Sequence, residues 1–445
     1  MQPVTSPFAV PRENLASLAG CRPAPADLRL LRAGLHSRRL VLLKSLLVRA
    51  DRHSVPPSVR QSLEKHWQLM ALAETRAPHA AREALAYPSV GNWLLHGLSI
   101  PLDEDEAFAA FLGNLGALAA AVALHTGTGF RMTLPAPGGR LTLPGLGAYQ
   151  ARDDRVRVVA GPRSLRLTPG RRSNGTVLMK PCTLAAGAGW QGLRPLSPGT
   201  GTAGPAGEGA VVDELDPYRA GTTPTGPVTP PITGSGSDGD RARAWTARWH
   251  GALVLLGAAD PARRAEVLSL VRALVPLPRP PDGSGTSSGT LRSAPLAVLT
   301  ELPGTAQEMA TVLVHEVQHS KLALLSDLVP LHHADGAAVH SVPWRADPRP
   351  FDAVLQGTYA HLALADLWHR LALRAGATPA ARALARSRAE HYREQVAGAL
   401  AVLRSSGELS RAGRYFTAGM VRHTTSLRTR PAPPRPADRN HVTVR

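Results

Sequence analysis

The chain has 445 residues, 43% of them hydrophobic, which is enough for more than one globular unit with a sizeable core. The formal net charge of +18 would suit a nucleic-acid-binding protein, but four of the 51 basic residues are lysine and arginine is spread along the whole chain. A phosphate-binding face requires clustered basic residues, so we expect no nucleic-acid partner. Two cysteines, Cys21 and Cys182, are too few for a disulfide framework and indicate a reducing compartment.

The first 127 residues predict an irregular N-terminus over residues 1–26 and a helical region over residues 27–127. Leu- and Arg-rich segments at 27–50 and 57–75 have amphipathic spacing. A third, short helical piece precedes Tyr87, and a further helix is expected at 103–125, where acidic residues precede an Ala-rich uncharged run. This run predicts a buried core helix and not a membrane span, and the N-terminus lacks a signal-peptide pattern. We therefore expect a cytoplasmic protein without a membrane partner.

Residues 128–194 predict a small β-rich region, because short β-prone runs alternate there with Gly, Pro and Asn-Gly. The expected strands are residues 130–134, 140–143, 156–159, 164–167 and 176–179. Residues 195–240 form a Gly/Pro-rich linker loop, and 276–290 a second such loop. Within the linker, the acidic and aromatic segment from Val211 to Arg219 is expected to dock onto the fold.

Residues 241–425 predict a metal-binding helical catalytic region, followed by a disordered tail over 426–445. Helices are expected at 241–275, at 305–329, from Asp352 as cap to 374, and at 378–405, with a short strand at 296–299. Residues 332–350 should form a loop stiffened by three prolines. The expected fold class is α+β and mostly helical: a metal-binding helical domain with a small antiparallel β insertion and long Gly/Pro-rich loops.

The segment around His315-Glu316-Val317-Gln318-His319 is the strongest chemical signal in the chain. Thr305 and Glu308 form a capping-box pattern ahead of it, and Pro330 marks the end of the helix. On a helix, His315 and His319 point the same way and can share one metal ion. Glu316 is close enough to act on a metal-bound water or to hold a ligand, so we assign it as the candidate catalytic residue.

A catalytic metal also needs a third protein ligand. The metzincin spacing fails because Leu322 and Leu325 stand at its Gly and His positions, and no glutamate occurs between Glu316 and Glu390 to complete a gluzincin site. His361 is the favoured candidate, although an isolated histidine on an apolar helix face is usually a core residue. The alternatives that stay open are His332, His333, His340, Asp347, Asp352 and Asp366.

Three histidines would suit zinc or iron. An iron(II) oxygenase would also need a cationic anchor for a carboxylate-bearing co-substrate, and Arg345 and Arg349 could form one. For either arginine the alternative is an ion pair with Asp347 or Asp352.

Three motifs resemble the HExxH-type 2-oxoglutarate-dependent peptide β-hydroxylases, also described as HExxH-containing peptide-modification proteins. They are Leu313 to Leu322, Pro343 to Pro350, and Leu355 to Ala363. The segments from Tyr87 to Leu94 and from Asp213 to Arg219 also look like that family, so the resemblance spans residues 85–420. The sheet insertion and the two Gly/Pro loops depart from the family pattern, which leaves substrate recognition open.

The resemblance implies an enzyme that uses Fe(II), O2 and 2-oxoglutarate to hydroxylate the β-carbon of a residue in a ribosomally synthesised precursor peptide. It implies His315, His319 and His361 as metal ligands and Arg345 or Arg349 as the 2-oxoglutarate anchor, with a radical SAM maturase as a further partner. In such an oxygenase Glu316 would orient a ligand or water. The alternatives are a zinc peptidase, in which Glu316 activates a Zn(II)-bound water, and a non-catalytic subunit of a maturation complex.

Overall fold

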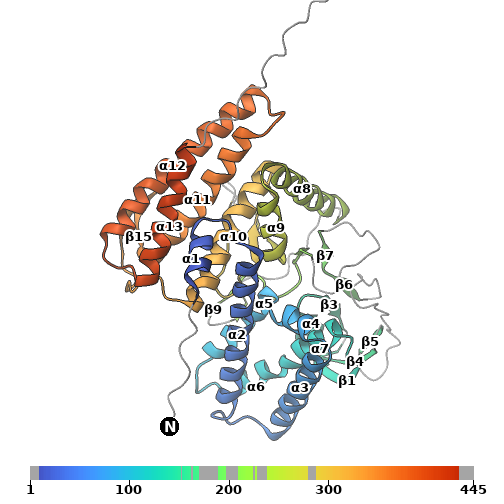
Figure 1. The fold of residues 1–445 in the computed structure, drawn as a ribbon. Coiled ribbons are helices and arrows are strands. Elements are labelled where there is room, and N and C mark those ends of the chain that lie inside the picture. Colours follow the sequence, from blue (N-terminus) through green and yellow to red (C-terminus); the bar gives the residue numbers. More distant parts are fainter. Residues whose placement is uncertain are drawn as a thin grey trace, which may run out of the picture. The chain divides into compact units, whose positions relative to one another are not determined.

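The computed structural model describes residues 10–151, 153–161, 164–169, 189–196, 209–223, 226–227, 238–278 and 287–429 (Figure 1). The regular structure of these residues consists of long helices and short strands, so the fold is mostly helical α+β, as predicted. The described chain divides into two units. Unit 1 comprises Ala24–Leu256 and Ala262–Val329, and unit 2 comprises Val10–Pro23, Gly257–Pro261 and the residues from Pro330 onward.

Unit 1 begins with helices whose first residue is proline, a position where the missing N–H has no cost. They are α2 (Pro25–Ala50), α3 (Pro57–Arg76), α4 (Pro78–Leu85) and α5 (Pro88–Ser99). The helix expected at 103–125 is two helices, α6 (Asp105–Gly113) and α7 (Leu115–His125), which meet at Asn114. The whole stretch is long and apolar enough to cross a membrane, but 72% of its most apolar window is buried in the fold. It therefore has the environment of a core helix, as predicted.

Two three-stranded antiparallel sheets follow, which confirms the predicted β region. One contains β1 (Phe130–Pro135), β4 (Arg155–Gly161) and β5 (Ser164–Pro169). The other contains β2 (Arg140–Leu143), β3 (Gly147–Gln150) and β6 (Trp190–Gly192). The strands β3 and β6 were not predicted, and the strand predicted at 176–179 lies outside the described residues.

The third sheet of unit 1 leads into the helix that carries the HExxH motif. Its order is β12 (Ser288–Gly289), β13 (Ala297–Thr300), β11 (Ala273–Pro276), β8 (Val211–Val212) and β7 (Arg194–Pro195). The central strand β11 is parallel to both β13 and β8, and all four of its residues are buried. A two-stranded pair, β9 (Thr222–Thr223) and β10 (Gly226–Pro227), lies apart from this sheet.

The helix predicted over 241–275 is wrong beyond Leu270. Helix α8 (Asp238–Ala259) is followed by α9 (Pro261–Leu270), and the chain then enters β11. Strand pairing on both sides of β11 takes precedence there over helical propensity. The strand predicted at 296–299 is confirmed as β13, and it precedes α10 (Ala306–Leu328).

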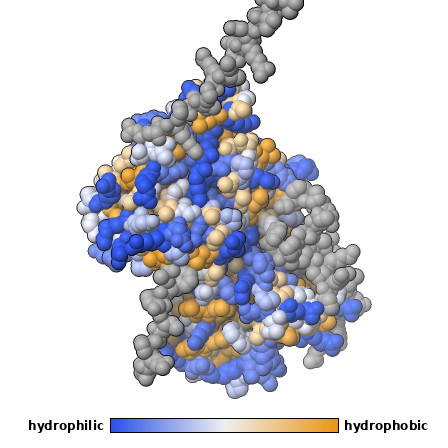
Figure 2. All heavy atoms as spheres, viewed as in Figure 1, coloured by the Kyte–Doolittle hydropathy of each residue, from blue (hydrophilic) through white to orange (hydrophobic). Residues whose placement is uncertain are grey.

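Unit 2 contains α11 (Phe351–Leu373), α12 (Pro379–Ser405) and α13 (Arg411–Thr429), which lie side by side in Figure 1. Helix α1 (Arg12–Ala19) packs against α13, so the prediction of an irregular segment through residue 26 is wrong for residues 12–19. The predicted disordered tail begins too early, because 426–429 belong to α13, and residues 430–445 lie outside the described chain. Most residues of α12 are exposed, and hydrophilic side chains cover much of unit 2 on the face in Figure 2.

The segment expected to be a stiff loop at 332–350 contains a β-hairpin. Strand β14 (Ala338–Val342) pairs with β15 (Arg345–Pro350), with two irregularities of register. Prolines at 348 and 350 are compatible with this because a two-stranded ribbon has only edge strands. Pro350 and not Asp352 is the N-cap of α11, and Asp352 lies in its first turn.

Candidate metal centre

Helix α10 is fixed at both ends by the signals that predicted it. Thr305 Oγ1 accepts a hydrogen bond from the Glu308 amide at 3.1 Å, and Glu308 Oε2 accepts one from the Thr305 amide at 3.3 Å. The helix ends at Leu328, just before Pro330. Met309, Leu313 and Val317 lie on the buried side with at most 1% of their surface exposed. The His-Glu-x-x-His motif is therefore held on a regular helix that is anchored by its cap and its buried face.

The imidazoles of His315 and His319 converge on this helix. Their Nε2 atoms are 3.0 Å apart, and the ring centroids are 4.7 Å apart with the rings nearly perpendicular. Both side chains are partly exposed, whereas Glu316, Val317 and Gln318 between them are buried. The predicted pairing of the two histidines on one helix face is thus present.

This spacing fits a shared metal ion. Two imidazole nitrogens that each lie about 2.1 Å from one ion, at roughly a right angle, are about 3 Å apart. The partial exposure of both rings leaves them accessible to an ion from solvent. Two imidazole donors suit either zinc or iron(II).

Glu316 is held in a way the sequence did not predict. Its carboxylate accepts hydrogen bonds from Ser288 Oγ at 2.8 Å and from Thr290 Oγ1 at 2.9 Å, one on each oxygen. The side chain is 1% exposed. Ser288 belongs to β12 and Thr290 follows it, in a segment predicted as a Gly/Ser-rich loop. No spacing signal in the sequence connects these hydroxyls to Glu316, because the contact depends on how the edge strand packs against α10.

A buried charged triad ties the second half of α10 to α9. Lys321 Nζ lies 2.5 Å from Glu266 Oε1, and Arg263 Nη1 donates to Glu266 Oε2 at 2.6 Å. All three side chains are at most 3% exposed. Burial alone would raise the pKa of Glu266, but the two cations outweigh it and the pKa is lowered. Lys321, two residues after His319, thus has a structural partner.

His361, the predicted third ligand, lies on α11 in unit 2 and is partly buried. Its ring meets Trp344 edge-on, with centroids 4.5 Å apart, and Tyr392 of α12 with centroids 5.3 Å apart. The indole of Trp344 fits over α11 because residue 357 is glycine: a Cβ there would lie 2.7 Å from the Trp344 ring. The histidine is thus surrounded by aromatic rings from the hairpin turn and from α12.

The two candidate anchors lie on β15. Arg345 is exposed, and Arg349 Nη1 donates to Asp347 Oδ2 at 3.2 Å. The ion pair considered as an alternative role therefore exists for Arg349, and it is largely exposed, so it contributes little to stability. Both arginines keep guanidinium donors in solvent-accessible positions.

Several of the open alternatives for the third ligand already have polar partners in unit 2. His332 Nε2 lies 3.3 Å from Asp352 Oδ1, and His340 Nε2 lies 3.0 Å from Glu408 Oε1. Asp366 is fully buried and paired with Arg22 and Arg370. Among the residues that the structure describes, no three His, Cys, Asp or Glu side chains form a group that could hold a metal. His315 and His319 belong to unit 1 and His361 belongs to unit 2, and the third ligand stays a prediction.

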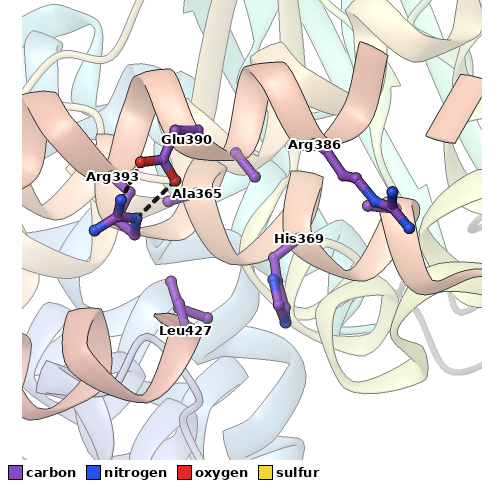
Figure 3. Close-up of a pocket in the computed structure, with 8 residues that line it drawn as sticks. Ala365, His369, Arg386, Glu390, Arg393 and Leu427 are labelled. Atoms are coloured by element: carbon purple, nitrogen blue, oxygen red, sulfur yellow. Dashed lines mark hydrogen bonds and ion pairs between the residues drawn. The ribbon is translucent and has the colours of Figure 1, made fainter. Parts of the chain in front are cut away.

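Unit 2 also has an open cavity of about 300 Å³ between α11, α12 and α13 (Figure 3). His369, Arg386, Glu390 and Arg393 contribute its polar lining, and the ion pair between Glu390 and Arg393 lies at one side. The remaining lining side chains are small or apolar.

Comparisons of the chain with protein-family models and with curated proteins find no match.

Proposed function

We propose that the protein is an iron(II)- and 2-oxoglutarate-dependent oxygenase that hydroxylates the β-carbon of a residue in a ribosomally synthesised precursor peptide in the cytoplasm. The observation that carries the metal site is the convergence of His315 and His319 Nε2 to 3.0 Å on one face of a capped helix. The assignment to a peptide hydroxylase rests on the three sequence motifs that resemble that family.

In this proposal His315 and His319 hold the iron, and His361 is the third ligand. Arg345 or Arg349 binds a carboxylate of 2-oxoglutarate through charge-assisted hydrogen bonds. With O2 and 2-oxoglutarate, bound iron supplies an oxidation in which one oxygen atom enters the peptide C–H bond and the other enters succinate, with release of CO2. The protein's part is to hold the ligands, orient the co-substrate and peptide, and exclude water.

The environment of Glu316 favours the oxygenase over a zinc peptidase. A hydrolytic base must reach a metal-bound water, whereas the Glu316 carboxylate is buried and each of its oxygens already accepts a hydroxyl hydrogen bond. This arrangement suits a residue that positions α10. In the proposed oxygenase, Glu316 contributes to the metal site by fixing the position of α10, which carries His315 and His319.

The first test is succinate formation from 2-oxoglutarate by protein purified without oxygen, loaded with Fe(II) and then exposed to air. We expect succinate above the level of a His315→Ala control, because oxygenases of this kind turn over slowly without their main substrate. Absence of succinate combined with tight zinc binding and cleavage of a denatured protein would replace the oxygenase by the peptidase.

The ligand and anchor assignments have separate tests. His361→Ala should lower the iron content of anaerobically reconstituted protein, and normal iron occupancy in that variant would remove His361 from the ligand set. Arg345→Ala or Arg349→Ala should weaken 2-oxoglutarate binding at least tenfold, since a charged hydrogen bond contributes about 1.5–3 kcal/mol. If both single variants bind 2-oxoglutarate as the wild type does, the anchor lies elsewhere.

A further inference from the structure

Unit 1 contains a second feature that the metal chemistry does not use: a cavity of about 320 Å³. Its walls come from α5, α7, β2 with its flanking residues, and the segment 215–218, and none of its lining residues belongs to α10. The apolar lining residues Val90, Trp93, Leu118 and Leu141 are buried, with exposed fractions of 1–7%. The size and the apolar lining are those of small-ligand sites in proteins.

The cavity is held open by a set of buried hydrogen bonds between α5 and the segment after β8. Tyr87 Oη donates to Asp213 Oδ2 at 2.7 Å, and Ser89 Oγ donates to Asp216 Oδ2 at 2.6 Å. Asn92 Nδ2 donates to the Tyr218 carbonyl at 2.7 Å. The predicted docking of the acidic and aromatic segment is thereby confirmed. Because these contacts are internal to the protein, the cavity is formed before any ligand binds.

One cation at the cavity has hydrogen-bonding capacity left. The contact of the Arg140 guanidinium within the described part of the chain is a long hydrogen bond from Nη2 to the Leu215 carbonyl, at 3.5 Å, and no carboxylate there pairs with it. Partial burial lowers the pKa of Arg140, and the charge of Arg219 lowers it further. An anionic oxygen next to Arg140 would relieve this repulsion and satisfy the free donors.

Among the described residues that line the cavity, Asp216 is the one carboxylate, and it does not pair with Arg140. Both oxygens of Asp216 are occupied, Oδ2 by Ser89 and Oδ1 by the Tyr218 amide at 2.8 Å. Burial, together with the nearby Asp213, raises the pKa of Asp216 to about 7. Asp216 therefore carries a partial charge near neutral pH, and it opposes a bound anion less than a fully ionised carboxylate would.

We propose that this cavity binds a carboxylic acid with a bulky apolar body, the body packing on Trp93, Val90 and Leu141 and the carboxylate bonding to Arg140. Two sources share this chemistry: the C-terminal residue of a peptide with a large apolar side chain, and a free aromatic or branched acid. The proposal concerns equilibrium binding in unit 1, so it holds or fails independently of the iron site.

The test is isothermal titration of the full chain, without added metal, with 1-naphthaleneacetic acid and with 1-naphthaleneacetamide, which lacks the charge. We expect the acid to bind one-to-one and at least tenfold more tightly than the amide. In Arg140→Gln this preference should disappear, while Arg157→Gln, on the exposed face of β4, should keep it. Equal binding of acid and amide by the wild type, or no binding of either, overturns the proposal.

A cavity-filling variant tests the location. Ala117 lines the cavity from α7, and Ala117→Phe should abolish binding of both probes, whereas Ala71→Phe on the exposed face of α3 should not. Unchanged binding by a folded Ala117→Phe places the site elsewhere and overturns the proposal. If thermal unfolding shows that Ala117→Phe does not fold, the comparison of Arg140→Gln with Arg157→Gln decides whether the proposal holds.

A tetrapeptide Gly-Ser-Gly-Phe with a free C-terminus separates the two sources. If the tetrapeptide competes with naphthaleneacetic acid, the proposal holds and the ligand is a peptide C-terminus. Binding of naphthaleneacetic acid without competition by the peptide supports it with a free acid.

Discussion

At the scale of single residues, Glu316 keeps its position in the motif, but its carboxylate has partners that the motif spacing does not specify. It lies next to His315 in the chain, yet its carboxylate is bound by two hydroxyls from the β12 segment. Four-residue spacing fixed the direction of the two histidines, because helix geometry alone determines it. The direction and partners of Glu316 depend on a strand that is distant in the sequence.

Removing both hydroxyls that bind Glu316 should lower the stability of the protein. In Ser288→Ala/Thr290→Ala the buried Glu316 carboxylate loses its side-chain donors, and we expect the free energy of unfolding to fall by about 1–3 kcal/mol. Urea unfolding measures the change. Ser62→Ala, at an exposed position of α3, should leave it within about 0.5 kcal/mol. A double variant as stable as the wild type would mean that these hydrogen bonds do not hold Glu316.

Asp216 gives a pH dependence with a definite sign. Its folded-state pKa, about 7, lies above the ordinary value, so its contribution to stability is complete at low pH and is lost as the pH rises from about 4 to 7. The stability of Asp216→Asn relative to wild type should therefore increase between pH 5 and pH 8, by about 2–3 kcal/mol. Urea unfolding at the two pH values checks this, and a pH-independent difference would contradict it.

At the scale of the element, α10 depends on a buried charge cluster as well as on its capping box and apolar face. Glu266 pairs with both Arg263 and Lys321, and all three side chains are almost fully buried. Neutralising Glu266 would remove a buried anionic partner from two buried cations, which costs more free energy than the loss of a surface pair.

We therefore expect Glu266→Gln to destabilise the protein by about 3–5 kcal/mol and to reduce metal binding by the His315 and His319 pair, because α10 carries both. Chemical unfolding and metal titration measure the two effects. The matched control is Glu74→Gln, whose carboxylate is 43% exposed and lies 3.9 Å from His36. If Glu266→Gln were as stable as the wild type, the charged triad would make no net contribution to the free energy of unfolding.

At the scale of the whole chain, unit 2 is assembled from three separate stretches. Arg22 pairs with Asp260 at 2.9 Å and with Asp366 at 3.2 Å, and Arg370 of α11 pairs with the same two carboxylates. Tyr359 Oη donates to the Leu18 carbonyl at 2.6 Å. The N-terminal residues are thus part of the same core as the C-terminal helices.

This network predicts a large effect from a residue far from the motif. Asp366→Ala would leave Arg370 without one of its two carboxylates and disrupt the contact to Arg22, so we expect a loss of about 3–5 kcal/mol in the free energy of unfolding. Asp103→Ala, at an exposed position, is the control and should change it by less than about 0.5 kcal/mol. An Asp366→Ala variant with wild-type urea unfolding would contradict the role of the network.

By itself the sequence determined the mostly helical α+β class, the bounds of α10 and the pairing of His315 with His319. These follow from local rules, since capping boxes, prolines and four-residue spacing act within one or two helical turns. Tertiary structure decided that 273–276 is a strand, that 338–350 is a hairpin and that residues 12–19 form a helix of unit 2. It also decided the partners of Glu316 and Lys321. These outcomes depend on contacts between residues far apart in the chain, and no local pattern records which distant segment will supply the strand, hydroxyl or carboxylate.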